Sequence, residues 1–184
     1  TGPKIYEFEK KLKSTFLSKY SLAVNSATSA LHIACMSLDL KKNDYLWTTP
    51  ISFVASANCA LYCGVNIDFV DIDPLTFNIC PKELKIKLEI AAMENRLPKI
   101  LVVVHLAGTS ANMKEIYHLC KKYSVSIIED ASHAIGGKYH GEYIGNCKFS
   151  DVTVFSFHPV KIITTAEGGL CTTNSNKLFK KIES

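Results

Sequence analysis

Short apolar runs alternate along the chain with longer stretches of helical periodicity. The runs are rich in β-branched and aromatic side chains, which is typical of buried strands. The predicted strands occupy 22–24, 45–48, 67–70, 100–104, 126–129, 152–155 and 169–172. The predicted helices occupy 5–20, 28–38, 52–63, 81–93 and 111–123, with a further helical stretch at 177–184. Strands that are apolar on both faces, each followed by a helix, predict a three-layer α/β/α domain with a mostly parallel sheet.

Composition is that of an ordinary globular domain, with 47% hydrophobic and 21% charged residues in a chain of 184. No apolar run is long enough to span a bilayer, and no secretion signal is present, so we expect no membrane association. The 7 cysteines include no Cys-x-x-Cys pair and lie mostly in apolar stretches. They indicate a reducing compartment, and we expect a cytoplasmic protein. The abrupt start and end predict a piece of a longer protein.

Net charge is +4, and the basic residues are nearly all lysines dispersed along the chain. The densest group, 10–13, falls on a helical pattern beside Glu7 and Glu9, which is typical of a solvated helix face. We therefore expect no nucleic-acid partner.

The loop at 25–30 joins a predicted strand to a predicted helix and is rich in small and hydroxylated residues. Backbone N–H groups at the start of a helix have no partner within it, so this loop could bind an anion with the help of a hydroxyl. Ser26 or Thr28 could equally serve as a plain N-cap. Neither glycine-rich motif for nucleoside triphosphates or dinucleotides occurs in the chain.

Two further loops carry charged residues directly after buried strands. Glu129 and Asp130 end one strand, and His133 follows. Asp130 either caps the next helix or pairs with a protonated ring nitrogen. Lys161 follows the next strand in an apolar loop, where loss of water favours the neutral amine that attacks a carbonyl, although a plain surface lysine is the alternative. Asp130, His133 and His158 lack a further ligand at a known spacing, so no metal site is predicted.

Taken together, these loops resemble the DegT/DnrJ/StrS family of sugar aminotransferases, a branch of the fold-type I enzymes that depend on pyridoxal 5'-phosphate. The matching segments keep the family's order, at 2–3, 8–9, 25–31, 49–55, 129–134, 155–161 and 167–169. Two of them are most similar to the pseudaminic acid branch, which transfers an amino group to carbon 4 of a UDP-linked 4-keto-6-deoxy-N-acetylhexosamine. The resemblance therefore implies that 1–184 is the cofactor-binding large domain of a fold-type I transferase.

The resemblance also implies a role for each candidate site residue. Lys161 would hold the cofactor covalently and shuttle protons, and Asp130 would bind the pyridine nitrogen. Phe53 would stack on the ring, and His133 would lie near the ring hydroxyl. The remaining implied contacts are to the phosphate, from Ala27, Thr28 and Ser156, and to the substrate, from His158 and Glu167.

The implied reaction takes an amino group from an amino acid, glutamate, and passes it to a nucleotide-linked keto sugar used in cell-surface polysaccharides. The family's active sites lie between the subunits of a homodimer. Its N-terminal segment and C-terminal small domain are expected to lie outside 1–184, and their absence is expected to impair the chain on its own. Ala107-Gly108 departs from the Tyr-Gly of many relatives.

Two alternatives share this fold. One is a pyridoxal phosphate-dependent sugar dehydratase, in which a histidine replaces the lysine. The other is a non-catalytic domain that binds the cofactor or a sugar, or that serves in dimerisation. Lys161 argues against the first, and Lys161 together with Asp130 argues against the second.

Overall fold

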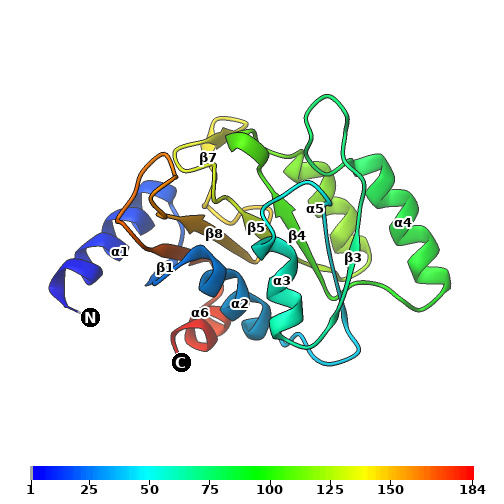
Figure 1. The fold of residues 1–184 in the computed structure, drawn as a ribbon, viewed down its shortest axis with the longest axis horizontal. Helices are drawn as coiled ribbons and strands as arrows, with labels where there is room; N and C mark the ends of the chain where they lie inside the picture. Colours follow the sequence, from blue (N-terminus) through cyan, green and yellow to red (C-terminus); the bar gives the residue numbers. More distant parts are fainter. Residues whose placement is uncertain (1) are drawn as a thin grey trace.

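Seven strands form one sheet in the computed structural model, which describes residues 2–184 (Figure 1). The strands are β1 (Tyr20–Val24), β2 (Tyr45–Thr48), β3 (Asn66–Phe69), β4 (Ile100–Val104), β5 (Ser126–Asp130), β8 (Val152–Ser156) and β9 (Gly169–Thr173). Their order across the sheet is β1-β9-β8-β5-β4-β2-β3. Every neighbouring pair is parallel except the two that β9 forms with β1 and β8. The prediction of a mostly parallel sheet is confirmed.

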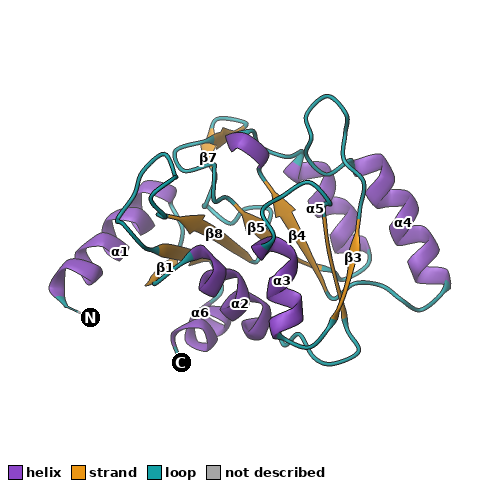
Figure 2. Ribbon diagram, in the orientation of Figure 1, coloured by secondary structure: helices purple, strands orange, loops and turns teal. Residues whose placement is uncertain are grey.

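Helices cover both faces of this sheet (Figure 2). One face carries α2 (Ala27–Ser37), α3 (Ala55–Tyr62) and α6 (Asn176–Glu183), and the other carries α4 (Pro81–Met93) and α5 (Met113–Lys122). The first helix, α1 (Pro3–Phe16), packs beside β1. A short turn η1 (Leu106–Gly108) and a hairpin of β6 (Lys138–Tyr139) and β7 (Glu142–Tyr143) complete the fold, and neither was predicted. The three-layer α/β/α prediction is confirmed.

The central strand β4 shows why both faces are buried. Its side chains alternate between the two sides of the sheet, as they do in any strand. Ile100 and Val102 pack with residues of α2 and α3, whereas Leu101 and Val103 pack with residues of α4 and α5. All residues of β4 are buried, so the strand appears in the sequence as a continuous apolar run.

The predicted helix over 5–20 is wrong at its carboxyl end. The helix stops at Phe16, and Leu17 adopts a left-handed conformation with a φ of 61°. Tyr20 is already the first residue of β1 and pairs with Thr173 of β9. This pairing with a strand far along the chain decides where the helix ends. The local sequence pattern does not indicate the pairing.

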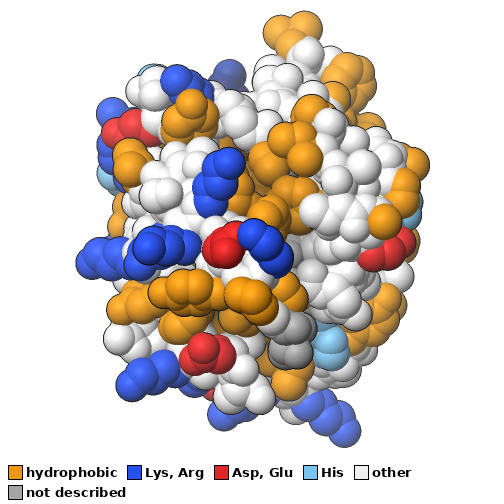
Figure 3. Space-filling model, turned by 90° about the vertical axis from the view of Figure 1, so that its left-hand side faces the viewer, with side chains coloured by type: hydrophobic (Ala, Val, Ile, Leu, Met, Phe, Trp, Pro, Cys, Tyr) orange, Lys and Arg blue, Asp and Glu red, His pale blue; other side chains and the backbone are white. Residues whose placement is uncertain are grey.

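The charged side chains of the face that carries α1 and the two termini are dispersed (Figure 3). Lysines lie there among apolar and uncharged groups, and Lys4 pairs with Glu7 at 2.8 Å with both side chains exposed. The dispersal predicted from the sequence therefore holds on this face. In the part of the chain that the structure describes, no helix is long and apolar enough to cross a bilayer.

Gly145 lies where two aromatic rings leave no room for a side chain. The rings of Phe16 and Phe155 stack with their centroids 4.6 Å apart. A Cβ on Gly145 would lie 2.8 Å from the Phe155 ring and 3.0 Å from the Phe16 ring, and its φ of +103° already disfavours other residues. Gly141 has a comparable φ of +82°, with nothing within 4 Å of its Cβ position.

We therefore expect Gly145→Ala to destabilise the protein much more than Gly141→Ala. Both substitutions strain the backbone, at a cost of about 1–2 kcal/mol. Only Gly145→Ala also overpacks the core, which adds about 1–3 kcal/mol. Urea unfolding of the two variants measures the difference, and equal losses of unfolding free energy would show that the aromatic pair tolerates a methyl group.

Candidate active site

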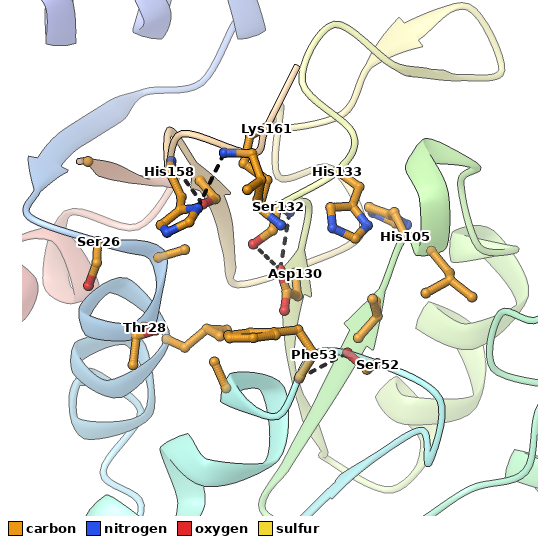
Figure 4. Close-up of a pocket in the computed structure, with 18 of the residues that line it drawn as sticks. Ser26, Thr28, Ser52, Phe53, His105, Asp130, Ser132, His133, His158 and Lys161 are labelled. Atoms are coloured by element: carbon orange, nitrogen blue, oxygen red, sulfur yellow. Dashed lines mark hydrogen bonds between the residues drawn. The ribbon is translucent and has the colours of Figure 1, made fainter. Parts of the chain in front are cut away.

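The carboxyl ends of β4, β5 and β8 and the amino-terminal ends of α2 and α3 surround a cavity of about 280 Å³ (Figure 4). In sheets of this kind, the crevice beyond the carboxyl ends of the strands is where ligands bind. Every residue predicted for the site lines this cavity: Ala27, Thr28, Phe53, Asp130, His133, Ser156, His158, Lys161 and Glu167. The structure thus brings residues from distant parts of the sequence into one place.

The amino-terminal end of α2 forms one wall. Ser26 is the N-cap, and its Oγ accepts a hydrogen bond from the Ser29 backbone N–H at 3.1 Å. The N-cap role considered for Ser26 is therefore confirmed, and Thr28 is inside the helix. Within residues 2–184, the N–H groups of Ala27 and Thr28 have no hydrogen-bond partner. These groups and the positive end of the helix dipole favour an anion.

Gly169, the first residue of β9, allows this wall to lie close to the sheet. A Cβ at this position would lie 2.5 Å from the carbonyl carbon of Ser26 and 2.7 Å from the backbone nitrogen of Ala27. Only glycine permits such an approach between two backbones. The Glu-Gly-Gly segment at 167–169 is therefore explained in part by backbone packing.

Asp130 lies at the floor of the cavity with a buried carboxylate. Its Oδ2 accepts a hydrogen bond from Ser56 Oγ at 2.6 Å. Its Oδ1 accepts from the N–H and Oγ of Ser132, at 3.1 and 2.6 Å. The predicted role as a helix cap is wrong, because within the described residues no helix follows Asp130 before β6, and its Oδ1 instead closes a local turn with Ser132. No cation pairs with Asp130 among the described residues 2–184, so a cationic ligand atom would balance its charge.

Phe53 and Lys161 face the cavity from opposite sides of Asp130 (Figure 4). The Phe53 side chain is 68% exposed, which is unusual for a large aromatic group and leaves its ring free to cover a planar ligand. Lys161 is half-buried and lines the cavity rather than lying on the open surface.

His133 lies between Lys161 and His105 (Figure 4). Burial and the positive charge of Lys161 lower the pKa of His133 below its ordinary value, against the opposite effect of Asp130. Its imidazole is therefore neutral at neutral pH, with one nitrogen that donates and one that accepts.

The mouth of the cavity carries the pair His158 and Glu167. His158 Nε2 and Glu167 Oε1 lie 3.9 Å apart, and both side chains are exposed. Ser156 lies deeper, at the end of β8, where its Oγ accepts a weak hydrogen bond from the His158 N–H at 3.4 Å. His158 and Glu167, which were predicted to contact the substrate, therefore lie at the entrance of the cavity. Ser156, one of the residues predicted to contact the phosphate, lies further inside.

His105, which lines the cavity, forms a buried pair with Glu129 that was not predicted. His105 Nε2 lies 2.8 Å from Glu129 Oε2, and its Nδ1 accepts from the Ala111 N–H at 3.2 Å, so Nε2 carries the proton. Glu129 also accepts hydrogen bonds from the hydroxyls of Ser150 and Thr153. Glu129 was visible as a second acid at the strand end, but nothing local indicated which histidine would reach it.

The hydrogen bonds around Glu129 determine the pKa of its carboxyl group. Burial alone would raise the pKa of Glu129, but the hydrogen bonds from His105, Ser150 and Thr153 outweigh this effect and lower the pKa below its ordinary value.

Within residues 2–184, no group of three His, Cys, Asp or Glu side chains could hold a metal ion.

Comparison with known proteins identifies the family to which the chain is similar. The profile of the DegT/DnrJ/EryC1/StrS aminotransferase family matches residues 1–184. The UDP-4-amino-4,6-dideoxy-N-acetyl-beta-L-altrosamine transaminase of Campylobacter jejuni is 42% identical over 187 aligned residues, which cover 99% of this chain and 46% of that protein. The chain spans about half the length of the curated relatives it matches.

Two solved structures show the same fold. The Helicobacter pylori aminotransferase involved in the biosynthesis of pseudoaminic acid is 36% identical, with a TM-score of 0.88 over 100% of this chain and 47% of that one. A putative sugar aminotransferase of Streptococcus pneumoniae in its PLP form is 26% identical, with a TM-score of 0.87 over 100% of this chain and 50% of that one.

The Glu129 network predicts an acid-dependent loss of stability. Because the pKa of Glu129 is lower in the folded protein than in the unfolded chain, its contribution is present above the ordinary value of about 4.3 and is lost as the pH falls through the folded value. We expect Glu129→Gln to lower the unfolding free energy at neutral pH by about 1–3 kcal/mol and to weaken its pH dependence in acid.

Urea unfolding between about pH 3 and pH 7 measures this effect. Glu115→Gln is the matched control, because Glu115 accepts one side-chain hydrogen bond from Asn112 on the exposed surface. A Glu129→Gln variant whose stability falls in acid as steeply as that of the unsubstituted protein would contradict the assignment.

Proposed function

Since the chain belongs to the DegT/DnrJ/EryC1/StrS aminotransferase family, we propose that its cavity binds pyridoxal 5'-phosphate and serves an aminotransferase. The observation that carries the proposal is the buried Asp130 carboxylate, which has only neutral donors and faces a cavity that Lys161 enters. A protonated pyridine nitrogen would balance this charge in a charge-assisted hydrogen bond. The residues present therefore fit the cofactor.

The phosphate of the cofactor would lie at the amino-terminal end of α2. The N–H groups of Ala27 and Thr28 point along the helix dipole toward this site, and Gly169 holds the turn against the sheet. The hydroxyls of Thr28 and Ser156, which also line the cavity, would add donors. An anionic phosphate fits this wall better than it fits the floor, where Asp130 is negatively charged.

The ring would lie between Phe53 and Lys161. Phe53 would cover one face, in a contact worth about 0.5–1.5 kcal/mol beyond burial. Neutral His133 would lie near the ring hydroxyl, where it can either donate or accept. Together these residues orient the ring and exclude water from it.

Lys161 is the proposed catalytic residue. When bound, pyridoxal phosphate supplies a carbonyl that takes up the amino group and a protonated ring that accepts electrons. Lys161 would hold that carbonyl carbon covalently before the donor arrives. Its amine, once released, would move a proton at the carbon that loses or gains the amino group.

The relatives support a class of acceptor substrate, and the donor is the one that the family resemblance implies. We propose glutamate as the amino donor and a nucleotide-linked 4-keto-6-deoxy sugar as the acceptor, with His158 and Glu167 near it at the mouth. The transaminase of Campylobacter jejuni and the aminotransferase of Helicobacter pylori support a substrate of the pseudaminic acid type. The product would serve cell-surface polysaccharide synthesis in the cytoplasm.

The proposed enzyme is a homodimer in which 1–184 forms the large domain. Exposed apolar side chains around the mouth support this arrangement, among them Phe53, Val54, Val160 and Ile162, each more than half exposed. Burial of these apolar side chains against a second subunit would remove them from water.

We expect the purified full-length protein to show a visible absorption band with pyridoxal phosphate that requires Lys161. Lys161→Ala should abolish both the band and covalent trapping of the cofactor by borohydride, because no other lysine among residues 2–184 lines the cavity. Lys85→Ala is the control, since Lys85 is exposed on α4. Added glutamate should bleach the band.

Each outcome separates the candidate functions. Covalent trapping that persists in Lys161→Ala would overturn the role of this lysine. A band that glutamate leaves unchanged would favour the dehydratase or a binding domain. No band in the full-length protein would exclude the proposed cofactor site.

A further inference from the structure

Two serine hydroxyls connect Asp130 to the loop that carries Phe53. Ser56 Oγ lies 2.6 Å from Asp130 Oδ2, across 74 positions of sequence. Ser52 Oγ lies 2.9 Å from Ser56 Oγ. Ser56 is fully buried in the first turn of α3, and it does not line the cavity.

The direction of this hydrogen-bond chain follows from the chemistry of its members. An ionised carboxylate only accepts, so Ser56 donates its single hydroxyl proton to Asp130. The Ser56 oxygen is then left as the acceptor for the Ser52 hydroxyl. The chain therefore runs from Ser52 through Ser56 to Asp130.

Ser56 also holds the Phe53 loop through its backbone. Its N–H donates to the Phe53 carbonyl oxygen at 3.1 Å and closes the turn that leads into α3. One residue thus holds the carboxylate with its side chain and the loop of the aromatic ring with its main chain. Among the described residues, the other carboxylate oxygen is held only locally, by Ser132.

We propose that Ser56 is a positioning residue that sets Asp130 and Phe53 relative to each other, although it touches neither cofactor nor substrate. The inference rests on the proposed function, in which Asp130 meets the edge of the cofactor ring and Phe53 meets its face. Ser56 acts through Asp130: without its hydroxyl, the carboxylate keeps its donors on one oxygen and loses its fixed orientation on the other.

The test compares the dissociation constant of pyridoxal phosphate across matched variants of the full-length protein, measured from the visible band. Ser56→Ala removes the bond to Asp130, and we expect affinity to fall about 10- to 100-fold, as for the loss of a hydrogen bond to a charged group. Ser56→Thr keeps the hydroxyl and should restore most of the affinity. Ser37→Ala is the control, because Ser37 is buried and its Oγ donates only to the Ala34 carbonyl.

A merely structural role is distinguished by comparing stability with binding. Ser56→Ala and Ser37→Ala should both lower the melting temperature, while only Ser56→Ala weakens binding. In a protein that already carries Asp130→Asn, adding Ser56→Ala should change the affinity for pyridoxal phosphate very little. The reason is that Ser56 acts on the cofactor through Asp130.

Three results would overturn the inference: a Ser56→Ala affinity equal to that of Ser37→Ala, no recovery in Ser56→Thr, or an equal Ser56→Ala effect with and without Asp130→Asn. If Lys161→Ala and Asp130→Asn both leave the band unchanged, the proposed function itself fails. If both respond and Ser56→Ala does not, only the role of Ser56 fails.

Discussion

Parallel pairing of β2, β4, β5 and β8 is the constraint on which the rest of the structure depends. Parallel neighbours cannot be joined by tight turns, so each connection crosses a face of the sheet, usually as a helix. Both faces become buried, and the central strands β4 and β8 are buried along their whole length. The same pairing directs the carboxyl ends of these strands to one edge, where the polar residues that follow them meet in a single cavity.

The end of β5 shows how this fold separates two adjacent carboxylates. Glu129 and Asp130 follow each other in the strand, so their side chains point to opposite faces. Glu129 accepts hydrogen bonds from the cavity-lining His105 and from two hydroxyls, and its charge is satisfied within the protein. Asp130 finds hydroxyls and one N–H at the cavity floor, but no cation among residues 2–184. One acid therefore stabilises the fold, while the other is available to a ligand.

Much of this arrangement was predictable, because its signals are local. Alternating apolar runs and helical patterns predicted the layers, and Lys161 and Asp130 were conspicuous as charged residues directly after buried strands. The end of α1 was not predictable in this way, since it depends on the pairing of β1 with β9. His105 and Ser56 were missed for the same reason: each acts on a residue of β5 from another element.

The sequence by itself determined most of the elements, the α/β class, the family and several of the residues that line the cavity, because each of these leaves a pattern within a short stretch of chain. Only the tertiary structure decided which partner each polar group has. Gly169 meets the start of α2, Ser56 meets Asp130, and His105 meets Glu129. Such contacts join segments distant in sequence, and their geometry is set by how strands and helices pack, which no local pattern encodes.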